Sequence, residues 1–223
     1  MLDCIILAGG LGTRLRSVVS NVPKPMADIN GRPFLEWQLE YLNRQGIRRV
    51  ILSIGYKGDI IQSHFGSKFV NLDIEYAYEK RALGTGGGIL NAIPKVRTKD
   101  FFIFNGDTFF PIDCKKMITT FEKKERPVIL MATFCADKNN RYGALNVCSE
   151  TQRLWGLQSA KSRIGDNANG GVYLCNKETW VKLSQYMAPN TNLSFENDLI
   201  PIMSRSGYSL MTERFDDVLI DIG

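Results

Sequence analysis

Short apolar runs alternate with amphipathic stretches along the first two thirds of the chain. Apolar runs predict strands, and apolar residues that recur at helical spacing predict helices. The predicted strands cover residues 4–7, 50–54, 74–78, 101–104 and 128–133, and the predicted helices cover 34–45, 59–65, 86–92 and 114–123. Because strands that alternate with helices pair in parallel, this order predicts an α/β fold with a Rossmann-like, mostly parallel sheet and helices on both faces.

The pattern loosens beyond residue 133. Short predicted strands at 145–147, 154–157 and 171–174 are separated by polar stretches, of which 159–169 is predicted to be a loop. They favour a small antiparallel layer added to the sheet. Helices at 178–186 and 195–205 and strands at 208–213 and 218–220 close the chain. No repeat or linker divides it, so a single domain over residues 1–223 is expected.

Composition is that of a soluble globular protein, with 44% hydrophobic and 23% charged residues. No stretch approaches the roughly 18 apolar residues of a membrane span. Asp3 stands among the first residues and the apolar run at 4–7 is too short for a signal peptide, so a cytoplasmic protein is expected. The cysteines lie singly without a C-x-x-C motif, which predicts buried or half-buried free thiols. They are Cys4, Cys114, Cys135, Cys148 and Cys175.

The net charge of +5 suits a small anionic ligand. The basic residues form no dense run and do not interleave with aromatic residues, which argues against a nucleic-acid partner. His64, the single histidine, falls on a predicted surface helix without a recognisable Ser or Cys partner, so Ser-His and Cys-His mechanisms are not expected. A predicted apolar helix face could meet the sheet or another subunit, which leaves a homo-oligomer open.

The stretch LAGGLGTRL, residues 7–15, places three glycines and Arg14 directly after the first predicted strand. It opens like the dinucleotide-binding G-x-G-x-x-G, but Leu15 stands where the third glycine belongs, and Asp28 comes before any second strand. A Walker loop would need Gly-Lys-Ser/Thr, which does not follow. A ligand-free turn would explain one or two glycines but not the guanidinium. Because glycine has no side chain, the backbone N–H groups of the loop stay accessible to an anion, and the arginine guanidinium can donate two hydrogen bonds to a phosphate. A phosphate-binding loop is therefore favoured.

Two aspartates are predicted to share a sheet edge with this loop, because ligands of open parallel sheets lie beyond the carboxyl ends of the strands. Asp107 follows the strand at 101–104, and Asp221 follows the last predicted strand. Each has an ordinary alternative. Asp107 could cap a turn or helix, and Asp221 could be a solvated residue after an edge strand.

Motifs spread over the whole chain resemble those of the sugar-phosphate nucleotidyltransferase (nucleotide-sugar pyrophosphorylase) family. The glycine loop, the Pro23-Lys24-Pro25 that follows it and Asn105-Gly106-Asp107 carry the resemblance. Further matches are Leu83-Gly84-Thr85-Gly86, Asn169-Gly170-Gly171, Phe195-Glu196-Asn197-Asp198 and Asp221-Ile222-Gly223. Within the family, the short length and Arg141-Tyr142-Gly143 are most similar to the bacterial branch that uses GTP and D-glycero-α-D-manno-heptose 1-phosphate.

The resemblance implies that a sugar 1-phosphate oxygen attacks the α-phosphorus of a nucleoside triphosphate and that pyrophosphate leaves. The product would be a nucleotide-activated sugar for surface polysaccharides. This nucleophile is already ionised near neutral pH, so positioning and charge neutralisation suffice and no histidine is needed. Arg14 would hold the β- and γ-phosphates, Lys24 the α-phosphate, and Asp107 with Asp221 the cofactor Mg²⁺, which takes one or two protein carboxylates.

The resemblance also divides the domain into a nucleotide-binding part, about 1–133, and a sugar-binding part with the closing strand, about 134–223. The implied nucleotide-binding residues are Leu7, Ala8, Gly9, Gly10, Gly12, Thr13, Glu79, Gly84, Thr85 and Asn105. The implied sugar-binding residues are Tyr142, Gly143, Lys161, Asn169, Gly170 and Glu196. Glu79 could instead be a surface glutamate, and Glu196 a first-turn acid of a helix capped by Ser194.

One segment departs from the family pattern. Family members carry a Glu-Lys pair before the N-[AG]-G motif, whereas this chain reads Leu157-Gln158-Ser159-Ala160-Lys161. The glutamate is absent, and Lys161 is the candidate for the sugar-phosphate contact. The alternatives are the same chemistry on a hexose 1-phosphate with GTP, dTTP, UTP or CTP and, more remotely, a non-catalytic protein that binds nucleotide sugars.

Overall fold

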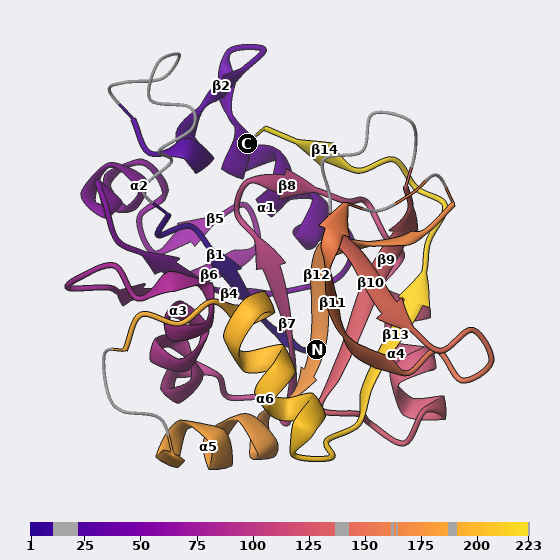
Figure 1. The fold of residues 1–223 in the computed structure, drawn as a ribbon. Helices are drawn as coiled ribbons and strands as arrows, with labels where there is room; N and C mark the ends of the chain where they lie inside the picture. The colour runs from indigo at the N-terminus through magenta and orange to yellow at the C-terminus, as the bar shows by residue number, and fades with distance from the viewer. Residues whose placement is uncertain (11–21, 137–142, 162, 164, 187–190, 223) are drawn as a thin grey trace.

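The structure, a computed structural model, describes residues 1–10, 22–136, 143–161, 163, 165–186 and 191–222 (Figure 1). Four neighbouring parallel strands form the centre of the main sheet. In sheet order they are β7 (Asp100–Asn105), β1 (Asp3–Leu7), β4 (Arg49–Ile54) and β6 (Leu72–Tyr78). The predicted mostly parallel sheet is therefore confirmed, and its central strands are the ones that the apolar runs indicated.

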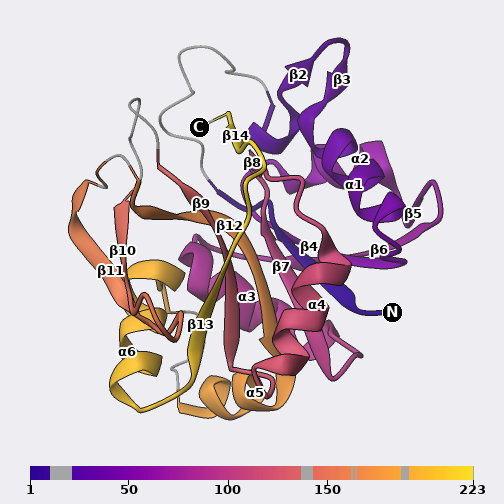
Figure 2. The same cartoon turned by 90° about the vertical axis from the view of Figure 1, so that its right-hand side faces the viewer.

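Helices cover both faces of this sheet, as Figure 2 shows. Successive side chains of a strand point to opposite faces, so β7 sends Phe102 and Phe104 into one apolar layer and Phe101 and Ile103 into the other. The first layer includes residues of α1 (Phe34–Arg44), α2 (Gly58–Phe65) and α4 (Cys114–Lys123), and the second includes residues of α3 (Gly84–Ala92), α5 (Lys177–Tyr186) and α6 (Ile200–Arg205). Burial on both faces explains why β7 is almost wholly apolar.

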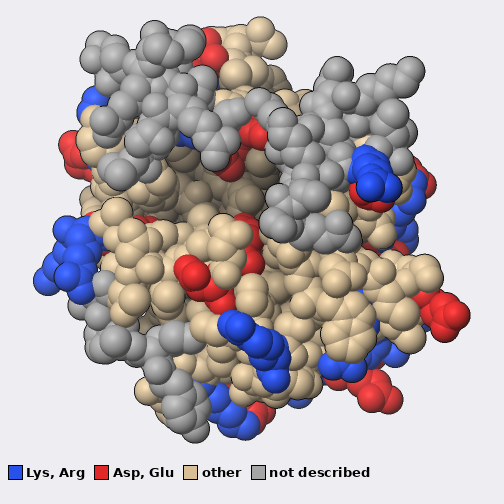
Figure 3. Space-filling view, in the orientation of Figure 1, with Lys and Arg blue, Asp and Glu red and all other residues tan. Residues whose placement is uncertain are grey.

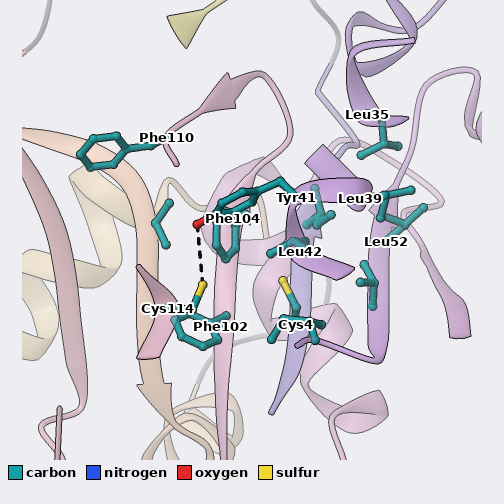
Figure 4. Packing of buried hydrophobic residues seen from close by; sticks show 14 of the residues in the cluster. Cys4, Leu35, Leu39, Tyr41, Leu42, Leu52, Phe102, Phe104, Phe110 and Cys114 are labelled. Carbon is teal, nitrogen blue, oxygen red and sulfur yellow. Dashed lines mark hydrogen bonds between the residues drawn. The ribbon is translucent and has the colours of Figure 1, made fainter. Parts of the chain in front are cut away.

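Figure 4 shows part of the first layer. Leu35, Leu39 and Leu42 recur at helical spacing on α1 and are fully buried in the layer that also contains Cys4 of β1 and Leu52 of β4. This is the amphipathic pattern expected of a helix on a sheet, and it fixes which side of α1 faces the strands.

Apart from the short β5 (Lys68–Phe69), which pairs with β6 at the other edge, the remaining strands of the sheet extend it on the β7 side, where they join it in the antiparallel sense. They are β12 (Asn167–Asn176), which pairs with β7, then β9 (Ile129–Cys135), β10 (Gly143–Val147) and β11 (Leu154–Lys161), with β13 (Leu210–Arg214) parallel to β9. Short elements complete the described chain: η1 (Lys24–Met26), β2 (Asp28–Ile29), β3 (Arg32–Pro33), η2 (Ile93–Lys95), β8 (Thr108–Phe109), the π-helix η3 (Phe195–Leu199) and β14 (Ile220–Asp221). The predicted antiparallel layer is present.

Three expectations were wrong in detail. The stretch 159–169, predicted as a loop, contributes its ends to β11 and β12, because backbone pairing with β10 and β9 forms these strands despite their polar sequence. The last strand covers Ile220–Asp221 rather than 218–220, so Asp221 lies within the strand. Cys135 is exposed rather than buried or half-buried, since it ends β9 at the edge of the core. Among the described helices, none combines the length and apolar character needed to cross a bilayer.

Candidate active site

The carboxyl ends of β1, β4, β6 and β7 meet at one edge of the sheet, where several of the predicted site residues lie. Leu7 ends β1 opposite Asn105, which ends β7, and Glu79 comes directly after β6. Ala8 continues from β1, and its N–H donates to the Ser53 carbonyl of β4 at 2.8 Å. In the orientation of Figure 1, the space-filling view shows a hollow over this edge with acidic atoms in it (Figure 3).

The turn between β7 and β8 carries Asp107 to this edge. The Gly106 N–H donates to the Leu7 carbonyl at 3.0 Å, which seats the turn on the end of β1. A Cβ at position 106 would collide with that carbonyl, so only glycine permits the approach. The close approach to β1 therefore explains the glycine in Asn105-Gly106-Asp107. The side chain of Asp107 is 40% exposed and so is accessible to a ligand.

Asp221 reaches the same turn from the other end of the chain. β14 pairs antiparallel with β8 so that Asp221 lies opposite Thr108, and the Ile222 N–H donates to the Asp107 carbonyl at 3.1 Å. The backbones of Asp107 and Asp221 are thus neighbours. Within the part of the chain that the structure describes, no group of three or more His, Cys, Asp or Glu side chains could hold a metal. A pair of carboxylates fits Mg²⁺, which keeps its other positions for phosphate oxygens and water.

Lys24 joins this pair. Its Nζ lies 2.5 Å from Asp107 Oδ2, and its side chain is only 15% exposed. Pro23 holds an extended backbone before the η1 turn, which Pro25 then continues, so the lysine is carried on a stiffened segment. A freely solvated lysine in a turn is therefore the wrong description. The ammonium instead stands at the proposed metal carboxylate, where two anionic substrates would need a compensating charge.

Glu79 lies beneath the start of the glycine loop and is not an ordinary surface glutamate. Ser53 Oγ donates to its Oε1 at 3.0 Å, and the Leu83 N–H donates to its Oε2 at 3.2 Å. A Cβ on Gly9 would collide with Oε1, which shows how closely the two residues approach. Burial raises the pKa of Glu79, against the lowering effect of these two hydrogen bonds. Gly10, the next residue of the loop, is exposed.

The Gly84-Thr85-Gly86 segment begins α3 and lies against the backbone of Leu193. Gly84 has φ of +71°, and a side chain there would collide with the Leu193 carbonyl, which accepts a hydrogen bond from the Gly86 N–H at 2.8 Å. Glycine at position 84 is thus demanded by both conformation and space. This contact places η3, which contains Glu196, against the first turn of α3.

A chain of hydrogen bonds links three of the predicted residues here. Thr85 Oγ1 donates to Glu196 Oε2 at 3.1 Å, Tyr173 OH donates to Glu196 Oε1 at 3.3 Å, and Asn169 Nδ2 donates to Tyr173 OH at 2.7 Å. Ser194 Oγ also accepts from the Asn197 N–H at 3.1 Å, so Glu196 is a first-turn acid of a Ser194-capped helix and a member of this network as well.

Tyr173 was not anticipated from the sequence. It is fully buried on β12, and burial, followed by the neighbouring Glu196, raises the pKa of its hydroxyl. Its position in the apolar run 171–174 marks it only as a core residue, and no sequence signal separates it from one. Gly170, between this run and Asn169, packs against Phe110.

Several predicted residues fall outside the description. Gly12, Thr13 and Arg14 lie in 11–21, and Tyr142 lies in 137–142, outside the described residues. The backbones of Gly143 and Lys161 pair with each other between β10 and β11, but the Lys161 side chain is also outside the description. The contacts of these residues with substrates therefore stay predictions.

Comparison with known proteins identifies the family of this chain. The model of the nucleotidyl transferase family matches residues 3–223. The chain is 38% identical over its whole length, and over 95% of the relative, to D-glycero-alpha-D-manno-heptose 1-phosphate guanylyltransferase of Campylobacter jejuni, and 37% identical, over 93% of the relative, to the protein of the same name from Aneurinibacillus thermoaerophilus.

Solved structures give the same result. HddC from Yersinia pseudotuberculosis superposes with a TM-score of 0.85 at 34% identity, covering all of this chain and 94% of HddC, and a second structure of HddC contains GMP-PN. The inositol-1-phosphate CTP transferase of T. maritima, at 19% identity and a TM-score of 0.80, shares the fold. With the family match spanning nearly the whole chain, this protein belongs to the nucleotidyl transferase family and is a sugar-1-phosphate nucleotidyltransferase.

Proposed function

We propose that this enzyme transfers GMP from GTP to D-glycero-α-D-manno-heptose 1-phosphate, releasing pyrophosphate and forming a nucleotide-activated heptose. The activity named for its two full-length relatives and the GMP-PN complex of HddC support the choice of substrates. The observation that carries the proposal is the meeting of Lys24, Asp107 and Asp221 beside the end of β1, because it gathers the charges that two phosphorylated substrates require.

The reaction forms a bond between a phosphate oxygen of the sugar 1-phosphate and the α-phosphorus of GTP, while the bond from that phosphorus to the β-phosphate oxygen breaks. The bonding electrons leave with pyrophosphate. No proton has to be removed from the nucleophile, so the protein has to align two anions and offset their repulsion. Lys24 would act at the α-phosphate, and Arg14 would hold the β- and γ-phosphates and then the pyrophosphate.

Asp107 and Asp221 would hold the divalent metal, for which we propose Mg²⁺. When bound, the metal neutralises charge on the phosphate oxygens during transfer. The protein contributes two carboxylates on a rigid turn and a paired strand, and leaves the other ligand positions to substrate and water. Lys24 would exchange its bond with Asp107 for a contact with the α-phosphate when the nucleotide binds.

Glu79 supports the choice of guanine. The Watson–Crick edge of guanine carries two adjacent donors, N1–H and the N2 amino group, which a carboxylate can accept in parallel. Thymine and uracil would turn a carbonyl oxygen toward the same carboxylate. Ser53 and Leu83 fix the orientation of Glu79 next to Gly9, so the acceptors are in place before the nucleotide binds.

The sugar would lie on the β12 side, with its phosphate at Lys161 and its hydroxyls at Asn169, Gly170 and Glu196. The proposed division follows from this arrangement: residues up to about 133 would bind the nucleotide, and those beyond would bind the sugar and close the site with Asp221.

Pyrophosphate release tests the proposal. The purified protein with Mg²⁺ is offered GTP, dTTP, UTP or CTP, each with the heptose 1-phosphate, mannose 1-phosphate or glucose 1-phosphate. We expect release to be fastest with GTP and the heptose. A higher kcat/KM for dTTP with glucose 1-phosphate would overturn the assigned substrates but keep the chemistry. Absence of release with every pair, while GTP still binds, would favour a non-catalytic binding protein.

A further inference from the structure

A buried glutamine lies behind the Asp107 turn. Gln38 belongs to the apolar side of α1, between Leu35 and Leu42, and is 1% exposed. A polar side chain in such a layer is costly unless it is hydrogen-bonded. Its location in an otherwise apolar stripe therefore calls for a specific partner.

The partners of Gln38 are two backbone carbonyls of the turn. Its Nε2 donates to the Asn105 carbonyl at 2.7 Å and to the Thr108 carbonyl at 3.0 Å. These carbonyls flank Gly106 and Asp107, so one side-chain amide spans the turn. Both partners are acceptors only, which requires the nitrogen and not the oxygen of the amide to face them. Within the described residues, nothing donates to Gln38 Oε1.

The other bonds of the turn come from the backbone of its neighbours. The Gly106 N–H donates to Leu7, and the Asp107 carbonyl accepts from Ile222. These bonds tie the turn to β1 and to the strand of Asp221. Among the described residues, the hydrogen bonds from α1 to this turn come from Gln38.

The same helix also supports the segment that carries Lys24. The Phe34 N–H, at the first residue of α1, donates to the Ala27 carbonyl at 2.9 Å, directly after η1. One helix thus fixes the backbone on both sides of the Lys24–Asp107 ion pair. A change in the turn relative to α1 would alter the distance between the ammonium and the carboxylates.

We infer that Gln38 is a positioning residue, which holds the Asp107 turn so that the Asp107 and Asp221 carboxylates converge on one cation. The inference rests on the proposed function, in which these two aspartates hold the metal. Partners behind metal ligands orient them, and their loss typically lowers metal affinity about 10- to 100-fold.

Two substitutions remove the donors while keeping the length of the side chain. Gln38→Met leaves both carbonyls without the amide. Gln38→Glu places a carboxylate against two carbonyl oxygens, which repel it. The two variants disturb the apolar layer differently, so an effect common to both is attributable to the lost hydrogen bonds.

Gln45→Met is the matched control. Gln45 follows the last residue of α1, and its Oε1 accepts from the Cys114 N–H at 3.1 Å, which ties α1 to α4 and not to the turn. This variant also loses a bond between a glutamine of the α1 region and a backbone group. It reports what such a loss does to stability without touching the site.

The experiment measures Mn²⁺ binding directly, by paramagnetic resonance, in full-length wild type and variants with a non-hydrolysable GTP analogue. Thermal unfolding without metal is recorded in parallel. We expect both Gln38 variants to bind Mn²⁺ at least about tenfold more weakly, while Gln45→Met binds it like wild type. Mn²⁺ affinity in folded Gln38→Met or Gln38→Glu equal to that of Gln45→Met would overturn the positioning role.

Asp107→Asn, measured in the same way, distinguishes a failure of the Gln38 role from a failure of the proposed metal site. Loss of Mn²⁺ binding in that variant together with unchanged binding in the Gln38 variants would remove only the role of Gln38. Unchanged binding in Asp107→Asn would overturn the metal assignment, and the inference with it.

Discussion

The two sides of the site are built from different interactions. On the proposed metal side, charged groups meet on a turn held by backbone bonds and by the Gln38 amide, with Asp107 paired to Lys24. On the proposed sugar side, neutral hydroxyl and amide groups form a chain of hydrogen bonds that ends on a single carboxylate, Glu196, with the buried hydroxyl of Tyr173 at its centre. The difference suggests that one side supplies rate by neutralising phosphate charge and the other supplies selectivity by shape and hydrogen bonding.

The largest effect on activity is expected at Asp107. We expect Asp107→Asn to lower kcat/KM for pyrophosphate release about a hundred- to a thousandfold. The substitution removes a negative charge from the proposed metal site and the ion-pair partner of Lys24. Asp113→Asn is the matched control, since Asp113 caps α4 and asparagine caps equally well. Comparable losses in both variants would contradict the assignment.

A smaller loss is expected at Lys24. Lys24→Met should lower kcat about a hundredfold with a modest effect on the KM of the sugar phosphate, because in the proposed function the ammonium would act mainly at the phosphorus under attack. Steady-state kinetics at saturating Mg²⁺ measures this. If the KM alone rises and kcat is retained, Lys24 belongs to ground-state binding rather than to transfer.

Tyr173→Phe tests the proposed sugar side of the site. Loss of the hydroxyl removes the acceptor of Asn169 Nδ2 and one of the donors to Glu196. The KM for the sugar phosphate should therefore rise about tenfold while the KM for GTP is unchanged. Tyr76→Phe loses a bond to the Gly66 carbonyl on an exposed part of the surface and is the control. An equal rise in both KM values would show that the network is not confined to the sugar side.

The smallest effect concerns stability. Burial raises the pKa of Glu79 above the 4.5 of an unperturbed carboxyl, so the folded chain keeps this proton at pH values where the unfolded chain has released it. The free energy of unfolding of wild type should therefore fall, relative to Glu79→Gln, as pH rises from the unfolded to the folded pKa. Denaturant unfolding of both proteins between about pH 4 and about pH 8 checks this; a constant difference would rule out the burial effect.

Prediction from the sequence succeeded where the residue types depend on the burial and backbone geometry of their own segment. Residues 101–104 are apolar because both faces of β7 are buried, and Asn105-Gly106-Asp107 follows because the turn needs glycine against Leu7. The β12 strand was only half predicted. Its first residues are polar and are formed by pairing with β9 and β10, which only the folded chain provides.

The supporting residues were missed for a related reason. Tyr173 and Gln38 are each a single polar group within an apolar pattern, and their partners lie at Glu196 and at the turn after β7, distant in sequence. Periodicity places such residues in the core but does not say what they bond. The roles of the site residues themselves, including Arg14 and Lys161, stay predictions.

The closing strand has a consequence for how the site is assembled. β14 is two residues long. Val218, two residues before it, is 76% exposed, Ile220 within it is 53% exposed, and Leu219 is only partly buried against the core, so detachment of this segment would uncover limited apolar surface. Local opening of this segment should cost far less than global unfolding. The segment with Asp221 would then pair with β8 late in folding and detach first on unfolding. Bound metal and nucleotide would stabilise its paired state by mass action. Protease cleavage near residue 217 should slow when both ligands are present, which makes the tail a reporter of occupancy.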